Sequence, residues 1–289
     1  MSTRRHYWIH GQDREAFLQD LVSQDLSGMQ AGDLRWSALL TPQGRLVADF
    51  FLYAPDSQRW WLDVEARQAD ALLRQLTLYR LRRDVSIEPQ AGQVVTLQND
   101  KGDKSIKSVK GNEPSAAGKG NGTAKAIPDP RLQALGLRLY SESGALEGEP
   151  EQAYRQRRIQ LGVPEGEDAL PGGTAMLIES GFVELNGLSV TKGCYVGQEV
   201  TARIFYRALV KRRLVPVQAS RDLRAGEPLL SKTGQQLGEV REAALDGWAL
   251  ALVRREALGD ALVTDDGAEV VAKPPSWLRW NPREDTALD

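Results

Sequence analysis

The run at residues 191–199 sets the only cysteine of the chain, Cys194, between Gly193 and Gly197. A glycine inside a helix costs roughly 1 kcal/mol relative to alanine. Inside a strand, a glycine marks a bulge or a place where another group approaches the backbone closely. The run is therefore predicted to form a shaped loop. We interpret the approaching group as a ligand rather than packed protein.

The cysteine and histidine content limits the chemistry. A single cysteine allows no internal disulfide, which indicates a reducing compartment. A conventional iron–sulfur cluster needs about four thiolates, so the chain cannot hold one alone. His6 and His10 are the only histidines. Their spacing would suit a metal on a helix, but no helix signal surrounds them, and no metal site is predicted.

Length and composition indicate an ordinary globular protein. A chain of 289 residues is expected to form two or three domains. With 41% hydrophobic and 26% charged residues, it can bury a sizeable core. No apolar run approaches the roughly 20 residues that a membrane span needs. Asp13 and Glu15 follow the basic N-terminus, which argues against a transit peptide. The net charge of −2 does not match nucleic acid.

The first hundred residues alternate between strand and helix patterns. Residues 13–22 and 65–79 have apolar side chains at helical spacing, and Asp13 is a plausible N-cap. Short strands are predicted at residues 35–40, 45–53, 60–64, 85–88 and 94–97. This order predicts helices on one face of a mostly antiparallel sheet.

The strand at residues 45–53 carries a carboxylate among aromatic side chains. Alternate residues from Leu46 to Leu52 form an apolar face, whereas Asp49 shares the other face with Phe51 and Tyr53. Such an aspartate lies either on a solvated edge or in the wall of a polar pocket.

The remainder divides into an insert, a second α+β segment and a β-rich end. Residues 99–126, rich in Lys, Gly, Ser and Asn, are predicted to be a flexible insert. A strand at 135–140 precedes a helix at 151–161, which lies between Pro150 and Gly162. Later short strands predict a small antiparallel barrel or sandwich, and residues 274–278 are expected to strap back over the body. We therefore assign 1–206 to an α+β region of two subdomains and 207–289 to the barrel.

The central run also resembles a known family. Lys192-Gly193-Cys194-Tyr195, Gly197-Gln198-Glu199 and Arg203 are similar to the signature of the YgfZ-type folate-binding proteins. That family takes part in iron–sulfur cluster assembly and repair, includes a mitochondrial branch, and is related to the aminomethyltransferase (T-protein) of the glycine cleavage system. The resemblance covers nearly the whole chain outside the insert. It implies α+β lobes around a central pocket, followed by an antiparallel β-barrel.

The resemblance further implies a tetrahydrofolate site. Its residues would be Asp49, Tyr154, Gln160, Lys192, Cys194, Tyr195, Gln198, Glu199 and Arg203. Asp49 stands where the aminomethyltransferases carry their essential aspartate, and Tyr154 could stack on a ring. Gln160 replaces the glutamate that reaches the pterin in those enzymes. Because an amide both donates and accepts, folate is expected to bind more weakly or in another register.

Cys194 admits several roles. A lone cysteine can be a small buried hydrophobe. It can be a reactive thiolate if the ammonium of Lys192 projects the same way. It can also supply one sulfur to a cluster shared with a partner, which the mitochondrial relatives resemble. We favour a functional thiol, with nucleophile, folate contact and shared ligand all left open.

A basic tract follows the signature. It consists of Arg203, Arg207, Lys211, Arg212 and Arg213, with Phe205 and Tyr206 interleaved. We interpret it first as a solvated strand face. Second, it could meet the carboxylates of a folate glutamate tail. Third, cations interleaved with aromatic rings could hold single-stranded RNA.

Together these patterns predict a tetrahydrofolate-binding accessory protein for the assembly or repair of iron–sulfur clusters, with an indirect effect on tRNA modification. The alternatives are a folate-dependent aminomethyltransferase, with Cys194 and Asp49 as catalytic residues, and an RNA-binding protein. We expect cluster carriers or client enzymes as partners, no membrane or direct nucleic-acid binding, and a monomer. The expected location is the cytoplasm or, alternatively, the mitochondrial matrix.

Overall fold

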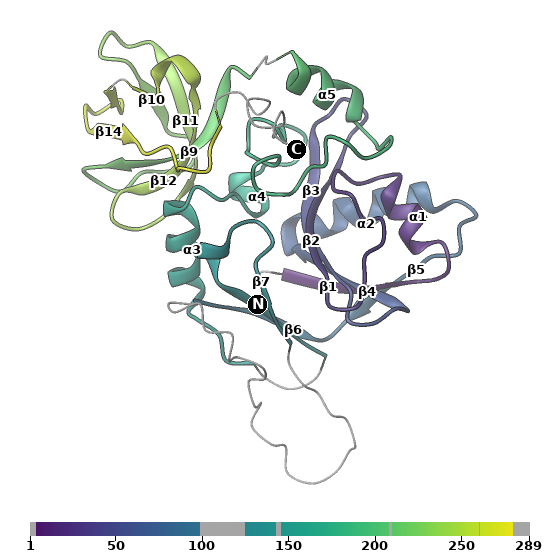
Figure 1. Ribbon diagram of the computed structural model, residues 1–289. Helices are drawn as coiled ribbons and strands as arrows, with labels where there is room; N and C mark the ends of the chain where they lie inside the picture. The colour runs from purple at the N-terminus through teal and green to yellow at the C-terminus, as the bar shows by residue number, and fades with distance from the viewer. Residues whose placement is uncertain (1–3, 99–124, 143–145, 208–209, 260, 280–289) are drawn as a thin grey trace.

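The computed structural model describes residues 4–98, 125–142, 146–207, 210–259 and 261–279 (Figure 1). Two α+β lobes are followed by a closed antiparallel barrel, so the predicted fold class is confirmed. Residues 99–124 of the predicted insert lie outside the described residues. Its last two residues, Lys125 and Ala126, are instead the start of a strand. In the part of the chain that the structure describes, every helix is too short or too polar to cross a membrane.

The first lobe is a five-stranded antiparallel sheet with two helices on one face (Figure 1). Its order is β2-β3-β4-β1-β5. The strands are β1 (Arg4–His10), β2 (Leu34–Leu40), β3 (Leu46–Tyr53), β4 (Arg59–Glu65) and β5 (Ser86–Gln90), and the helices are α1 (Arg14–Gln19) and α2 (Ala66–Arg80). Strand β1 was not predicted. It pairs with β4 and β5, which are remote in sequence, and its polar side chains alternate with buried ones.

Helix α1 is shorter than predicted and is capped differently. Asp13 occupies the N-cap position, but its side chain makes no capping bond to the helix. Its carboxylate instead accepts a 2.8 Å hydrogen bond from the backbone N–H of Asp84. The aspartate therefore joins the start of α1 to the segment before β5.

Strand β3 is buried on both faces. Ala48, Phe50 and Leu52 pack beneath α1 and α2, whereas Phe51 and Tyr53 belong to a second core shared with the next lobe. A strand between two cores exposes neither face to water. Asp49 is accordingly 1% exposed, which rules out the solvated edge, one of its two predicted positions.

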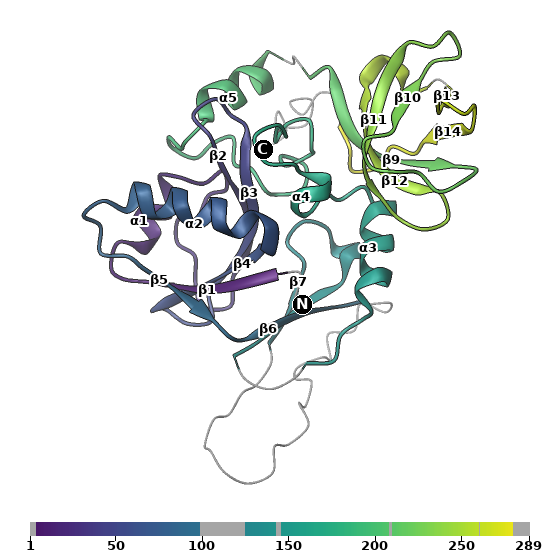
Figure 2. The same cartoon turned by 180° about the vertical axis from the view of Figure 1, so that it is seen from behind.

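The second lobe is a three-stranded sheet with a helix beside it. Its order is β6-β8-β7, formed by β6 (Gln93–Leu97), β7 (Lys125–Pro128) and β8 (Leu137–Ser141), with a 3-10 turn at Gln133–Leu135. Helix α3 (Glu151–Gln160) follows Pro150 and ends before Gly162, as predicted. It lies between this sheet and the barrel, and the short α4 (Gly166–Ala169) follows it (Figure 2).

The C-terminal part is a closed six-stranded barrel. Its strands are β9 (Arg212–Ala219), β10 (Pro228–Leu230), β11 (Gln236–Ala243), β12 (Trp248–Arg254), β13 (Leu262–Val263) and β14 (Glu269–Ala272), with a 3-10 turn at Arg255–Ala257. The predicted strap is confirmed, because the indole N–H of Trp277 donates a 2.8 Å hydrogen bond to the carbonyl of Leu161.

One helix before the barrel contradicts the sequence prediction. Residues 203–206, taken as the start of a basic strand face, belong instead to α5 (Gln198–Tyr206). Gly197, with φ of 79°, precedes its first residue. The glycine thus ends the loop and allows the chain to turn into a helix. Helix α5 ends at Tyr206, the last residue of the predicted first domain.

Candidate functional site

Lys192 fixes the loop of residues 191–199, which carries Cys194, to the end of α1 and the segment that follows it. Its Nζ donates hydrogen bonds to the carbonyl oxygens of Gln19, Val22 and Gln24, at 2.7, 2.7 and 3.0 Å. Burial lowers the pKa of Lys192 to about 8, so the ammonium remains mostly protonated at neutral pH. All three of its N–H donors are then used inside the protein. This corrects the expectation that Lys192 faces a ligand or the thiol.

Tyr195 and Gly197 fix the loop on its other side. The Tyr195 ring is buried in the core between the lobes, so it does not offer a face for stacking on a ligand. A Cβ at Gly197 would lie 2.5 Å from the carbonyl oxygen of Thr41, in the turn between β2 and β3. The group that approaches this glycine is therefore backbone, not the ligand we expected. At Gly193, by contrast, a Cβ would meet nothing within 4 Å.

Cys194 lies exposed at the outside of this anchored loop. The Gln198 amide reaches back to the Gly193 carbonyl at 3.4 Å. Glu199 pairs with Arg203 at 2.8 Å along α5, with side chains 83% and 54% exposed. Gln198 and Glu199, both predicted to bind folate, are therefore engaged within their own segment, and Glu199 is exposed to solvent.

Asp49 is fully engaged in the interior. One carboxylate oxygen accepts from the indole N–H of Trp36 at 3.0 Å, and the other from the backbone N–H of Gly166 at 2.9 Å. Its own N–H donates to Gln68. Burial raises the pKa of Asp49, and the nearby charge of Glu165 raises it further. Asp49 acts as a link between β3 and the start of α4.

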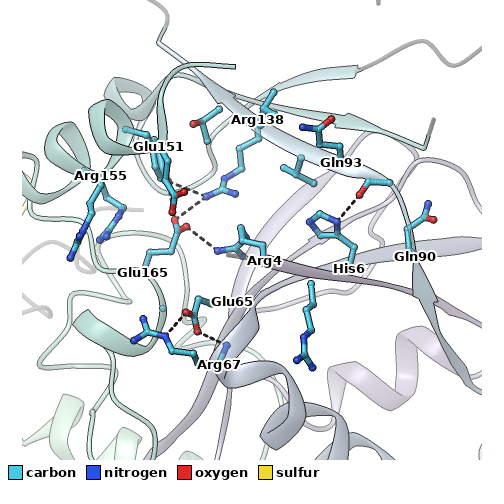
Figure 3. A pocket seen from close by; sticks show the side chains of 18 of the residues that line it. Arg4, His6, Glu65, Arg67, Gln90, Gln93, Arg138, Glu151, Arg155 and Glu165 are labelled. Carbon is cyan, nitrogen blue, oxygen red and sulfur yellow. Dashed lines mark hydrogen bonds and ion pairs between the residues drawn. The ribbon is translucent and has the colours of Figure 1, made fainter. Parts of the chain in front are cut away.

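A central cavity of about 1200 Å³ opens between β1, the β5–β6 connection, α3 and the barrel (Figure 3). Its wall is dominated by charged side chains, among them Arg4, Arg138, Arg158, Glu165 and Glu242. Of the predicted site residues only Tyr154 lines it. Gln160 is exposed and is not part of the lining.

Glu165 is the centre of this cavity wall, and the sequence did not reveal its role. Its carboxylate pairs with Arg4 at 2.9 Å, Arg131 at 2.7 Å and Arg138 at 2.9 Å. The hydroxyl of Tyr154 donates to it at 2.8 Å. The only local signal was a carboxylate between Pro164 and Gly166, because its three cations come from remote segments.

The same arginines also bind two further buried carboxylates. Asp63 pairs with Arg4 at 2.5 Å and with Arg138 at 3.4 Å, and Asp129 pairs with Arg131 and Arg138. Burial opposes ionisation of Glu165, but the charges of Arg138, Arg131 and Arg4 outweigh it and hold its pKa well below the usual range. The network joins both lobes to the segment before α4, with three cations balancing three carboxylates.

Nε2 of His6 lies 3.4 Å from Oδ1 of Asp63. Oε2 of Glu242, also in the cavity wall, has no hydrogen-bond partner among the described residues. The other oxygen of Glu242 accepts from Arg155 at 2.9 Å and Arg158 at 2.5 Å. No group of three or more His, Cys, Asp or Glu side chains within the described ranges could hold a metal ion. The chain therefore presents two separate features, an open polar cavity and an exposed thiol.

Comparisons with known proteins agree with this architecture. Residues 1–105 match the family model of the GCVT N-terminal domain, and residues 211–280 match that of the CAF17 C-terminal beta-barrel domain. The glycine cleavage system aminomethyltransferase T from Bartonella henselae is similar in structure, with a TM-score of 0.72 and 15% sequence identity over 97% of this chain and 85% of that one. At that identity the likeness concerns the fold alone.

Relatives found by sequence similarity say more than the shared fold, because they carry one common name. The iron–sulfur cluster assembly factors IBA57 of Homo sapiens and Mus musculus, both named as mitochondrial, are 30% and 31% identical over 93% of this chain and 82% of their own length. The mitochondrial IBA57 homolog of Neurospora crassa is 32% identical over 75% of this chain, and the match spans 52% of that protein.

Proposed function

The chain belongs to the family of the iron–sulfur cluster assembly factor IBA57, and on that premise we propose that it assists the assembly or repair of iron–sulfur clusters in client proteins. The observation that carries the proposal is that Cys194 is exposed on a loop whose position is fixed by the hydrogen bonds of Lys192 to buried carbonyls. One thiolate cannot hold a conventional cluster, which needs about four ligands. Cys194 would supply one ligand, and a carrier or client protein the others.

Two of the other roles considered for Cys194, the packed hydrophobe and the nucleophile, have less support. An exposed sulfur is not a packed hydrophobe. A nucleophile needs an adjacent base, and no side chain among the described residues makes a hydrogen bond to this sulfur. A shared ligand needs only access to a partner and a fixed position, which the anchored loop offers.

Replacing Cys194 tests the proposal. The Cys194→Ser variant should fold normally but fail to restore the activity of a [4Fe–4S] client enzyme in cells that lack this protein. Thiolation of tRNA by iron–sulfur enzymes should fall with it, as an indirect consequence of lost clusters. The matched control is Thr191→Ser, a conservative change at an exposed residue of the same loop. Normal activity of the client enzyme in cells that express Cys194→Ser would contradict the proposal.

Tetrahydrofolate does not fit the residues predicted to hold it. Both oxygens of Asp49 are bonded, the ammonium of Lys192 is used by three carbonyls, and Gln160 lies outside the cavity. The place that could accept a pterin N–H is Oε2 of Glu242, which has no partner in the cavity wall. We therefore place the proposed folate in the central cavity, as a binding function separate from the thiol.

Tryptophan fluorescence tests folate binding, because Trp61 packs 5.5 Å from the ring of His6 in the cavity wall. Titration with tetrahydrofolate should quench the wild type, and Glu242→Gln should weaken the quenching. A flat titration would remove folate from the proposal and leave the role of Cys194 untouched. The aminomethyltransferase alternative has little support, since Asp49 is already bonded through both oxygens.

The partners follow from the same proposal: cluster carriers or client enzymes, with the chain expected to act as a monomer. The names of the relatives support the mitochondrial matrix, the second of the two predicted compartments, and give no support to the cytoplasm.

A further inference from the structure

A second hollow, of about 1000 Å³, lies between α5 and the barrel. We call it the basic groove. It is lined by Met176, Glu179, Ile204, Val210, Lys211, Arg212, Arg254, Arg255 and Glu256. Ile204 comes from α5, Arg212 begins β9, and Lys211 immediately precedes that strand (Figure 1). The backbone N–H of Arg255 donates to the carbonyl of Lys211 at 2.9 Å, which joins the cations at 211–212 to those at 254–255.

The groove carries a surplus of positive charge. Two of its cations are matched by two carboxylates, and the exposed Lys211 adds a further positive charge, on a chain whose net charge is −2. Arg212 pairs with Glu179 at 3.0 Å, and Arg254 with Glu256 at 3.3 Å. Within the described ranges, no carboxylate lies at ion-pair distance from the exposed Lys211. A concave surface with this surplus attracts an acidic partner.

The floor of the groove is apolar. Met176 and Ile204 are half-buried, and Val210 is buried beneath them. An unbranched methionine adapts to the shape of an incoming side chain. Tyr206, at the end of α5, is 56% exposed beside this region. An apolar floor within a basic rim fits a chain segment that carries one apolar anchor between carboxylates.

The exposed thiol and the groove lie near opposite ends of α5. Cys194 lies just before α5, and Ile204 lies near its other end. A helix of nine residues is about 13 Å long, so a single protein partner can cover both. We infer that an acidic segment of the partner that shares a cluster at Cys194 docks in the basic groove through an apolar anchor. The identity of that partner rests on the proposed function.

The contacts made by the basic tract at residues 203–213 argue against RNA as the occupant of the groove. Arg213 is fully buried against Glu184, and Phe205 is buried as well. Two other cations of the tract, Arg203 and Arg212, are paired with carboxylates. Base stacking needs exposed aromatic rings between the cations, and the buried Phe205 offers none, whereas an acidic peptide uses the charge of Lys211 and the apolar floor.

A binding experiment with the full chain tests the inference. The probe is a short fluorescent peptide of Asp and Glu with one central Leu, followed by fluorescence anisotropy. The peptide should bind, and its affinity should fall as salt rises. The double variant Lys211→Glu/Arg254→Glu should weaken binding at least about tenfold. The control Arg82→Glu/Lys232→Glu, with the same change in charge on exposed side chains elsewhere, should bind as the wild type does.

Further variants and probes in the same experiment test the groove independently of the proposed function. A peptide with Ser in place of the central Leu should bind more weakly, because it lacks the anchor. Cys194→Ser should leave peptide binding unchanged while failing in client activation. Equal binding by the groove variant and its control would overturn the groove proposal and leave the role of Cys194 standing. Groove-dependent binding of a single-stranded oligouridine in preference to the peptide would also overturn it.

Discussion

Asp49 and Gly166, separated by 117 residues in the chain, are joined by a 2.9 Å hydrogen bond from the backbone N–H of Gly166 to the carboxylate of Asp49. The second oxygen of the same carboxylate holds the indole of Trp36. The aspartate that the family resemblance nominates for catalysis is thus a buried link between the two lobes. It would have to break one of these bonds to reach a substrate.

Removal of the Asp49 carboxylate should therefore destabilise the fold. Asp49→Ala leaves two buried donors unpaired, at about 1–3 kcal/mol each. Asp49→Asn keeps one acceptor and should cost less. Because burial raises the pKa of Asp49, its ionised form is the less favourable one. The stability of wild type relative to Asp49→Asn should be highest below about pH 4 and should fall as pH rises through the folded pKa. Urea unfolding across this range measures the difference, and an opposite slope would contradict it.

Glu165 should have the reverse pH dependence. Glu165→Gln leaves the buried Arg131 and Arg138 short of negative charge, which costs about 3–5 kcal/mol for a buried pair. Since the arginines hold the pKa of Glu165 down, its contribution is complete above about pH 4.3 and is lost as pH falls through the folded pKa. The exposed Glu151→Gln, in the same cavity wall, is the control and should change stability by less than about 0.5 kcal/mol. Equal losses in urea unfolding would contradict the network.

Gly197 and Gly193 form a matched pair on either side of the cysteine. Gly197→Ala puts a Cβ 2.5 Å from the Thr41 oxygen at a positive φ, so it should destabilise by more than about 1 kcal/mol. Gly193→Ala meets open space at an ordinary φ and should be close to neutral. Thermal melting of the two variants measures the contrast. Comparable losses would show that the loop is not seated on the β2–β3 turn.

Lys192 should matter for the position of the thiol rather than for its chemistry. Lys192→Met removes three donors from buried carbonyls and should cost about 1–3 kcal/mol. Native-state hydrogen exchange should then increase around residues 19–24. Lys211→Met, at an exposed lysine, is the control. If both variants exchange alike, the anchor is not needed.

Cys194 should react freely in the folded protein because it is exposed. A thiol reagent such as dithionitrobenzoate should modify one thiol without denaturant, and Cys194→Ser should abolish the reaction. The serine variant should melt within about 1 °C of the wild type, since surface substitutions rarely change stability by more than about 0.5 kcal/mol. A thiol that reacts only after unfolding would contradict its surface position.

The elements that the sequence predicted well are those with strong local periodicity. Helix α2 and strand β3 carry apolar residues at fixed spacing, and α3 has Pro150 and Gly162 at its ends. Strand β1 was missed because its partners β4 and β5 lie far along the chain. Helix α5 was missed because its arginine and aromatic residues suit a strand face as well as a helix.

The sequence by itself determined that one thiol, Cys194, sits in a glycine-bounded loop, that no disulfide can form, and that α+β lobes precede a barrel. The tertiary structure alone decided where the polar groups point. Lys192 turns inward to three carbonyls, and Glu165 gathers arginines from three remote segments. The physical reason is that a buried charge must be paired or fully hydrogen-bonded, and its partners come from whichever segments the fold brings together. Local spacing carries no record of those partners.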